Sequence, residues 1–197
     1  MKKYIAEALG TFALTLVVAL SLLGSFPVST PVLAALVLAL FVYSIGNVSG
    51  AHINPAVTIG LWSIKKIRSS DAINYIGAQF IGAVAAFFLA SSWFDVSKYT
   101  NLSVGNSWEI GLAELIGTFF FAFGIASVVY DKVPSQMNGL VVGGSLLLGI
   151  TVAGLMGSNG VLNPAVAFGI GSFSFMYALA PIIGSVLGMK VYKAIQE

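Results

Sequence analysis

Apolar residues run in long blocks along this chain, and short polar stretches separate the blocks. A helix that crosses the ~30 Å hydrocarbon core of a bilayer needs roughly 20 such residues. Six blocks approach that length and predict six membrane-spanning helices: Tyr4–Leu23, Val32–Val48, Ile73–Trp93, Ile110–Tyr130, Leu140–Leu155 and Phe175–Val191. The pattern predicts an all-α integral membrane protein in which residues 1–197 form a single domain.

Two further apolar segments, Pro55–Ile64 and Pro164–Ile170, are too short to span. About 10 residues at about 1.5 Å each reach only half of the hydrocarbon core. Each segment follows an Asn, the residue favoured at a helix N-cap, and starts with Pro, which is favoured in the first helical position. We therefore expect two half-helices that together make a composite seventh span. A broken helix within a membrane usually marks a permeation path.

The chain also carries an internal repeat. The phrase at residues 6–12, AEALGTF, returns as AELIGTF at residues 113–119, and Asn54-Pro55-Ala56 returns as Asn163-Pro164-Ala165 at nearly the same offset. Two matches at nearly the same offset indicate a duplication. Each half holds three spans, so the second half must enter the membrane from the opposite side. We predict inverted repeats over about 4–93 and 110–192, with the working site where the halves meet near the bilayer midplane.

Composition and charge agree with a membrane protein: 58% of the residues are hydrophobic and 8% are charged. In the six-span topology one side receives all but one of the Lys and Arg residues: Lys2, Lys3, Lys65, Lys66, Arg68, Lys132, Lys190 and Lys193. Only Lys98, in the predicted external loop Asp95–Ser107, falls on the other side. The positive-inside rule then puts both termini in the cytoplasm. Short loops and tails favour a location in a cell membrane, either a plasma membrane or a bacterial inner membrane.

Several function classes are disfavoured. The chain has no cysteine, which removes disulfides and thiol catalysis. A single histidine, His52, cannot build a metal site or a catalytic triad. The charge pattern has no basic stripe with interleaved aromatics, so we expect no nucleic-acid partner. We predict that the protein is not an enzyme and needs no metal or cofactor.

Asn54 and Asn163 are the first candidate functional residues. Each stands at a half-helix N-terminus, which carries unsatisfied N–H groups and the equivalent of about +0.5 charge. Two such ends meeting inside the membrane would repel cations, and the two amides would donate hydrogen bonds to a passing oxygen. A water molecule held in this way points its hydrogens outward, which interrupts proton hopping. The alternative is that both residues only cap helices, and their duplication argues against it.

Glu7 and Glu114 lie inside predicted spans, where a carboxylate costs a few kcal/mol and needs polar partners. The segments before each Asn must run as non-helical backbone at membrane depth, with N–H groups to satisfy. We expect each Glu to accept hydrogen bonds from the loop of its own half. A proton-relay role is the alternative, and the lack of a second titratable group in the spans disfavours it. His52 is expected to pack in its loop and face the pore vestibule, with a gating role as its alternative.

These residues resemble a known family. The run Ser49–Trp62, the second Asn-Pro-Ala box and the paired Ala-Glu…Gly-Thr-Phe phrases closely resemble the aquaporins, or major intrinsic proteins, over about Ala6 to Tyr192. The resemblance implies a right-handed bundle of six tilted helices plus two half-helices. It also implies one pore per subunit, a homotetramer in the lipid bilayer, and Asn54 and Asn163 at the central constriction.

One departure from the family pattern bears on selectivity. Aquaporins usually place an Arg directly after the second Asn-Pro-Ala box, and this chain has Val166 there. Counting from each Asn gives Ala34, Thr151 and Gly160 as the rest of the filter. A ring of these residues has no fixed charge and little bulk, which predicts a wide entrance. The Asp that often follows the Arg in glycerol channels is Ala167 here, so the glycerol-channel subgroup is not indicated.

The sequence therefore predicts a passive channel for water and small uncharged solutes such as glycerol, urea and hydroxylated metalloids. A non-conducting membrane scaffold of the same fold is one alternative. A leaky ion-conducting relative is another, because a positive charge is missing from the filter, although Lys98 folded over the mouth could replace that charge. A secondary active transporter is disfavoured, because only Glu7 and Glu114 could couple ions at the midplane.

Overall fold

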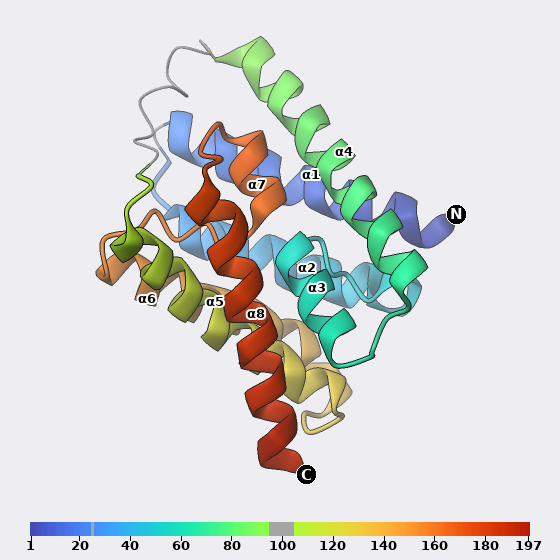
Figure 1. Cartoon of the computed structure of the whole chain (residues 1–197). Helices are drawn as coiled ribbons and strands as arrows, with labels where there is room; N and C mark the ends of the chain where they lie inside the picture. Colours follow the sequence, from blue (N-terminus) through green and yellow to red (C-terminus); the bar gives the residue numbers. More distant parts are fainter. Residues whose placement is uncertain (25, 95–104) are drawn as a thin grey trace.

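The structure, a computed structural model, describes residues 1–24, 26–94 and 105–197, and all of its regular structure within those ranges is helical (Figure 1). Each of the six predicted spans corresponds to a long helix, apolar and long enough to cross a membrane. These helices are α1 (Lys2–Leu23), α2 (Thr30–Ser49), α4 (Ser69–Trp93), α5 (Trp108–Val129), α6 (Asn138–Leu155) and α8 (Phe175–Gln196). Lys98 and most of the predicted external loop lie outside the described residues.

The two predicted half-helices are also present, as α3 (Pro55–Ser63) and α7 (Pro164–Gly169). The only other helical piece in the described chain is a 3-10 turn, Ser135–Met137, directly before α6. The helix order is therefore long, long, short, long, and then the same order again. This order follows the duplication of sequence phrases, because the same motif begins each short helix.

Local sequence signals explain where several of these helices begin and end. Ser107 and Ser174 stand before α5 and α8, and each side-chain oxygen accepts from a first-turn backbone N–H, that of Ile110 and that of Tyr177. Helix α2 has Pro31 in its first turn and Gly50 as its C-cap. Gly50 has a φ of +86°, a left-handed conformation that glycine adopts without steric cost, and it turns the chain into the first re-entrant loop.

The long helices pack in two groups that share one interface. Helix α1 packs on α2 and α4, α5 packs on α6 and α8, and α2 lies against α6 to join the groups. Each short helix packs on the last long helix of the other group, α3 on α8 and α7 on α4. The two groups therefore enclose each other's short helices, and neither could bury its re-entrant backbone alone.

Glycines allow the long helices to approach closely. A Cβ at Gly82 of α4 would overlap the carbonyl oxygen of Ala8 in α1, and one at Gly184 of α8 would overlap that of Leu115 in α5. At Gly143 of α6, a Cβ would lie 2.6 Å from the carbonyl oxygen of Ala35 in α2. Small residues at such crossings are typical of membrane bundles, in which close backbone approach supplies the packing.

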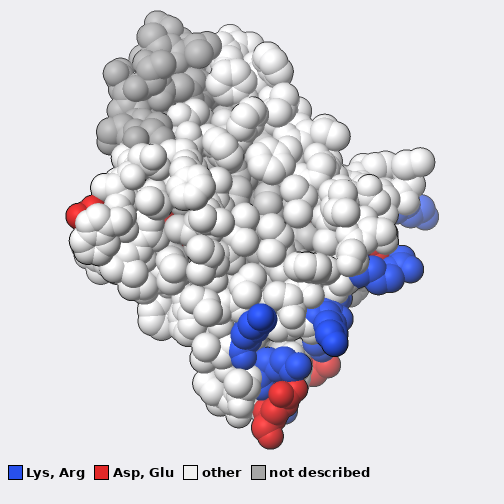
Figure 2. All heavy atoms as spheres, in the orientation of Figure 1, with Lys and Arg blue, Asp and Glu red and all other residues white. Residues whose placement is uncertain are grey.

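The molecular surface agrees with a bilayer environment. Large apolar side chains are exposed on the outer faces of the long helices, among them Leu40, Ile81, Phe88 and Leu148. In the view of Figure 2, Lys and Arg side chains gather along the lower right edge, and the broad face above them is almost entirely uncharged. An apolar exterior of this extent is stable in lipid and would cause aggregation in water.

Two neighbouring glycines of α6 test the close helix contact. We predict that Gly143→Ala lowers the apparent melting temperature in detergent micelles, because the new methyl group must push α2 away at a cost of about 1–3 kcal/mol. Gly144→Ala is the matched control, because nothing lies within 4 Å of a Cβ there. This variant should match or slightly exceed the wild type, since alanine is the better helix former. Equal losses of stability in the two variants would contradict the close contact.

Candidate functional site

The N-terminal tips of α3 and α7 meet and are joined by reciprocal hydrogen bonds. The Asn54 amide nitrogen donates to the carbonyl oxygen of Leu162 at 2.9 Å, and that of Asn163 donates to the carbonyl oxygen of Ile53 at 3.0 Å. Each amide oxygen also caps its own helix, accepting from Ala56 N in α3 and from Ala165 N in α7. An Asn amide has two N–H groups, so each side chain keeps one donor beyond this cross-link.

The loop before α3 is held by Glu7 of α1, whose side chain is fully buried. Its Oε1 accepts from His52 N at 2.9 Å and from Ser49 Oγ at 2.7 Å. Its Oε2 accepts from Ile53 N at 2.7 Å and from Gln79 Nε2 of α4 at 2.8 Å. The predicted hydrogen bonding of Glu7 to its own loop is confirmed in this geometry.

Glu114 of α5 holds the second loop in the same way and is equally buried. Its Oε1 accepts from Ser158 Oγ and, at 3.0 Å, from Val161 N, while its Oε2 accepts from Leu162 N at 2.7 Å. The phenol of Tyr177 on α8 supports the same loop and accepts from Asn159 N at 3.2 Å. A buried carboxylate with several N–H and O–H donors is well satisfied, and its loss would leave those donors unpaired.

The residue directly before each Asn has a left-handed backbone. Ile53 has a φ of +40° and Leu162 a φ of +55°, and both side chains are fully buried. This conformation is costly for a residue with a side chain, above all for a β-branched one such as Ile53. The N–H groups of both residues are bound by the glutamates, so the anchors also hold the strained turns. Neither position is a glycine, so no residue in the sequence marks these left-handed turns.

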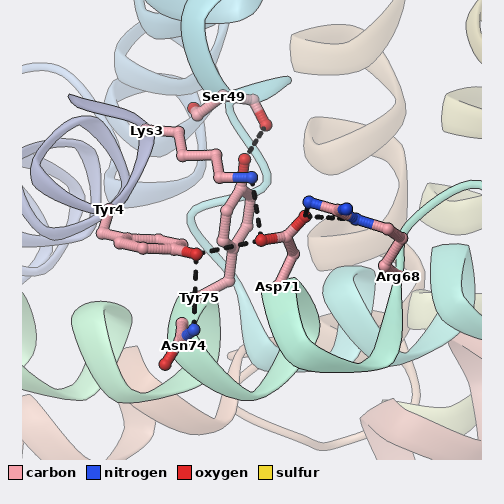
Figure 3. Close-up of polar contacts among 7 residues, drawn as sticks. All are labelled: Lys3, Tyr4, Ser49, Arg68, Asp71, Asn74 and Tyr75. Atoms are coloured by element: carbon pink, nitrogen blue, oxygen red, sulfur yellow. Dashed lines mark hydrogen bonds and ion pairs between the residues drawn. The ribbon is translucent and has the colours of Figure 1, made fainter. Parts of the chain in front are cut away.

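A polar cluster outside the tips ties the first loop to α1 and α4 (Figure 3). The carboxylate of Asp71 pairs with Lys3 Nζ at 2.8 Å and with Arg68 Nη2 at 3.1 Å. One turn further along α4, the Tyr75 hydroxyl donates to the carbonyl oxygen of Ser49 at 2.8 Å, where α2 ends. The cluster fixes the start of α1 and the start of α4 close to the loop that Glu7 holds.

Two cavities lie on either side of the paired tips. The larger, about 290 Å³, is lined by residues that include Ala34, Asn54, Gly160, Asn163 and Val166. The smaller, about 190 Å³, is lined mainly by aliphatic side chains of α2, α3, α5 and α6. Leu38, His52 and Phe121 line both cavities. The two spaces therefore adjoin at the level of these three side chains.

Three of the four predicted filter residues, Ala34, Gly160 and Val166, line the larger cavity, and the prediction for Thr151 is wrong. Thr151 is exposed, and its hydroxyl donates to the carbonyl oxygen of Leu147 in its own helix. Ile150 lines the cavity instead. Neighbouring residues on a helix point about 100° apart, so an error of one position in ungapped counting moves a side chain from the cavity to the outer face.

Three further residues line the cavities, and only for His52 was this position anticipated from the sequence. His52, expected to pack in its loop and face a vestibule, lines both cavities, lies 5.0 Å from the Tyr75 ring, and has its Nδ1 3.2 Å from Thr58 Oγ1. Lys66, counted only as a topology marker, lines the smaller cavity. Ser172 was not singled out, yet it lines the larger cavity with a buried hydroxyl that has no hydrogen-bond partner among the described residues.

The glutamate anchors can be tested by one isosteric change. We predict that Glu114→Gln lowers the apparent melting temperature in detergent, because its NH₂ group would face a backbone N–H and leave a buried donor unpaired, at about 1–3 kcal/mol. Glu109→Gln makes the same chemical change on an exposed side chain in the first turn of the same helix, and it should have little effect. Similar shifts in both variants would show that Glu114 does not anchor the loop.

Comparisons with known proteins agree with this geometry. The profile of the family described as "Major intrinsic protein" matches residues 1–192. Aquaporin AqpM of Methanothermobacter thermautotrophicus is 31% identical, with 98% of this chain and 96% of that protein covered. Aquaporin Z of Bradyrhizobium diazoefficiens is also 31% identical, with 100% and 94% covered. Nodulin-26 of Glycine max is 30% identical, with 100% of this chain and 78% of that protein covered.

A solved structure has the same fold. The X-ray structure of the aquaglyceroporin from Plasmodium falciparum superposes with a TM-score of 0.77 at 23% sequence identity, covering 99% of this chain and 96% of that one. With the family profile and relatives matched over nearly the whole sequence, the chain belongs to the major intrinsic protein family, the aquaporins, which are passive membrane channels for water and small solutes rather than enzymes.

Proposed function

We propose that this protein conducts water and small uncharged solutes, among them glycerol, urea and hydroxylated metalloids, through a permissive filter. The observation that carries the proposal is the uncharged lining of the larger cavity beside the paired tips. Ala34, Ile150, Gly160 and Val166 supply no charge and no hydrogen-bonding side chain. A solute that enters this cavity meets weak steric exclusion. The lining also carries no fixed positive charge that would bind the polar groups of the solute.

The loops supply the polar side of the path. The N–H groups of His52 and Ile53 are bound by Glu7, and those of Val161 and Leu162 by Glu114. The loop groups left to face a solute are therefore carbonyl oxygens, together with the remaining amide N–H of each Asn. Carbonyls accept from the hydroxyl or amide groups of a solute, and the aliphatic wall opposite takes its apolar face. Glycerol and urea combine these features at small size.

Exclusion of protons and cations is assigned to the tips. The two half-helix N-termini each contribute about half a positive charge, and the Asn amides orient a passing water molecule so that its hydrogens point away from them. An Arg at position 166 would add a unit charge, worth at most about 4 kcal/mol at about 4 Å and an effective dielectric of about 20. We therefore propose that the cation barrier is lower than in relatives with that Arg, and still present.

The setting of the channel is part of the same proposal. We assign it to a cell membrane, plasma or inner, with both termini in the cytoplasm, because basic side chains gather at one edge of the molecule. One channel domain, made of two inverted repeats, would form one pore in each subunit of a homotetramer. The family resemblance supports the tetramer, and the large apolar exterior leaves room for subunit contacts.

Stopped-flow light scattering on proteoliposomes tests the function. Water and glycerol permeabilities well above those of empty vesicles are expected. Permeabilities equal to those of empty vesicles would contradict the proposal and favour a non-conducting scaffold. A potassium flux through the channel that exceeds its glycerol flux would favour an ion-conducting relative instead.

The filter itself is tested at position 166. We predict that Val166→Arg reduces glycerol permeability roughly tenfold, as a barrier increase of about 1.4 kcal/mol would, and reduces water permeability less. The long charged side chain narrows the cavity and binds solute hydroxyls, and water is small enough to pass. Val166→Met lengthens the side chain without adding charge. Comparing it with Val166→Arg separates the effect of side-chain bulk on permeability from the effect of charge. Equal fractional losses of water and glycerol permeability in Val166→Arg would refute this assignment of the filter.

A further inference from the structure

We propose that Lys66 adds to the ion selectivity that the tips supply, by holding a positive charge at the mouth of the smaller cavity. In this proposal the charge that the larger cavity lacks at Val166 is supplied at the opposite end of the path. The inference rests on the proposed channel function, because ion selectivity has meaning only for an open path. It adds a residue, and a location, to which that function assigns no role.

The position of Lys66 follows from the way in which α3 ends. Lys65 has a φ of +62°, its N–H donates to the carbonyl oxygen of Trp62, and the N–H of Lys66 donates to that of Leu61. This pair of bonds around a left-handed residue is a Schellman cap. The cap reverses the chain, so that Lys66 comes back beside Leu61. Both residues line the smaller cavity.

Two contacts hold the ammonium group in place. Lys66 Nζ donates to the carbonyl oxygen of Val129 at 3.2 Å and lies 4.5 Å from the centroid of the Tyr130 ring. Val129 is the last residue of α5, where helix carbonyls lack intrahelical partners and the helix dipole is negative. The ring face attracts the same cation. The charge is therefore held at the cavity wall, although the side chain is exposed at the mouth.

The surroundings strengthen the field of this charge along the path. The other residues of the smaller cavity are largely aliphatic or aromatic, among them Val42, Val57, Ile125 and Val142. Low-dielectric walls focus the field of a nearby charge into a cleft. Among the described residues that line either cavity, Lys66 is the one Lys, Arg, Asp or Glu.

The neighbouring basic residues are placed differently. Arg68 is paired with Asp71, as is Lys3. Lys65 is exposed and lines neither cavity in the described structure. Lys65 therefore carries the same charge one residue away without facing the path, and it supplies a matched control.

The experiment compares Lys66→Met with Lys65→Met. Glycerol flux is measured in proteoliposomes, and potassium and chloride permeabilities are measured in planar bilayers. We expect Lys66→Met to raise potassium permeability relative to chloride by roughly three- to tenfold at low salt, as the loss of a focused charge would. The change should shrink near 1 M salt, where the Debye length falls to about 3 Å. Lys65→Met should resemble the wild type.

Tyr130 gives a second test that leaves the lysine in place. Tyr130→Leu removes the ring that holds the ammonium group and should shift the potassium-to-chloride ratio in the same direction as Lys66→Met. Tyr130→Phe keeps the ring face and should behave as the wild type does. If the wild type, Lys66→Met and Tyr130→Leu have equal ion selectivity while glycerol flux is present, the role of Lys66 is overturned and the channel function is not. Wild-type vesicles that pass neither water nor glycerol would overturn the channel function, and this inference with it.

Discussion

The structure depends on one constraint, that backbone polar groups inside a bilayer must find partners within the protein. Two segments of this chain leave helical conformation at membrane depth, and each exposes N–H groups that lipid cannot satisfy. The protein meets this need with two buried carboxylates, Glu7 and Glu114, each on the first long helix of its own half. The cost of placing a carboxylate in a membrane span is offset by the donors that it satisfies.

The two glutamate anchors also allow the tips of α3 and α7 to meet. Because the glutamates bind the N–H side of each loop, the tips of α3 and α7 can come close enough for each Asn to reach the other loop's backbone. Each short helix also packs on the last helix of the opposite group, so the cross-link at the tips and the packing at the flanks stabilise the same arrangement. The cavities on either side of the tips are a consequence of that arrangement.

The proposed selectivity has two separate physical origins. Steric and hydrogen-bonding selection belongs to the larger cavity, in which small uncharged residues such as Gly160 and Val166 leave a permissive passage. Selection against charge belongs to the dipoles of the two tips and, in our inference, to Lys66 at the far mouth. Separating the two functions would let the channel admit polar solutes of varied shape without admitting cations equally. A filter Arg would combine both kinds of selection in one residue.

Much of this arrangement was predictable from the sequence. The long apolar blocks, the Asn-Pro starts and the lone carboxylates within spans each have one economical physical explanation, and the structure contains the corresponding helices, caps and hydrogen bonds. Features that depend on three-dimensional register were not predictable. Counting from Asn163 leads to Thr151, one residue past Ile150, because counting carries no information on the length of the intervening loop. The left-handed turns at Ile53 and Leu162 have no glycine to mark them.

Lys66 illustrates the same limit in another way. A basic residue near a span end is usually a topology marker, and nothing in its neighbours distinguishes Lys66 from Lys65. The difference arises from the cap at the end of α3, which brings Lys66 to the wall of the smaller cavity and leaves Lys65 outside it. Such a cap usually has glycine at its left-handed position, and Lys65 occupies that position here.

The central claim is that the tips of α3 and α7 are coupled through their asparagines. A double-mutant cycle on Asn54→Ala and Asn163→Ala tests it most directly, with the free energy of unfolding measured by SDS titration in mixed micelles. If the tips hold each other, loss of either amide frees both. The double variant is then less destabilised than the sum of the single variants, with a coupling energy of about 1 kcal/mol or more. Additive losses would contradict the claim, because they would mean that each Asn only caps its own helix.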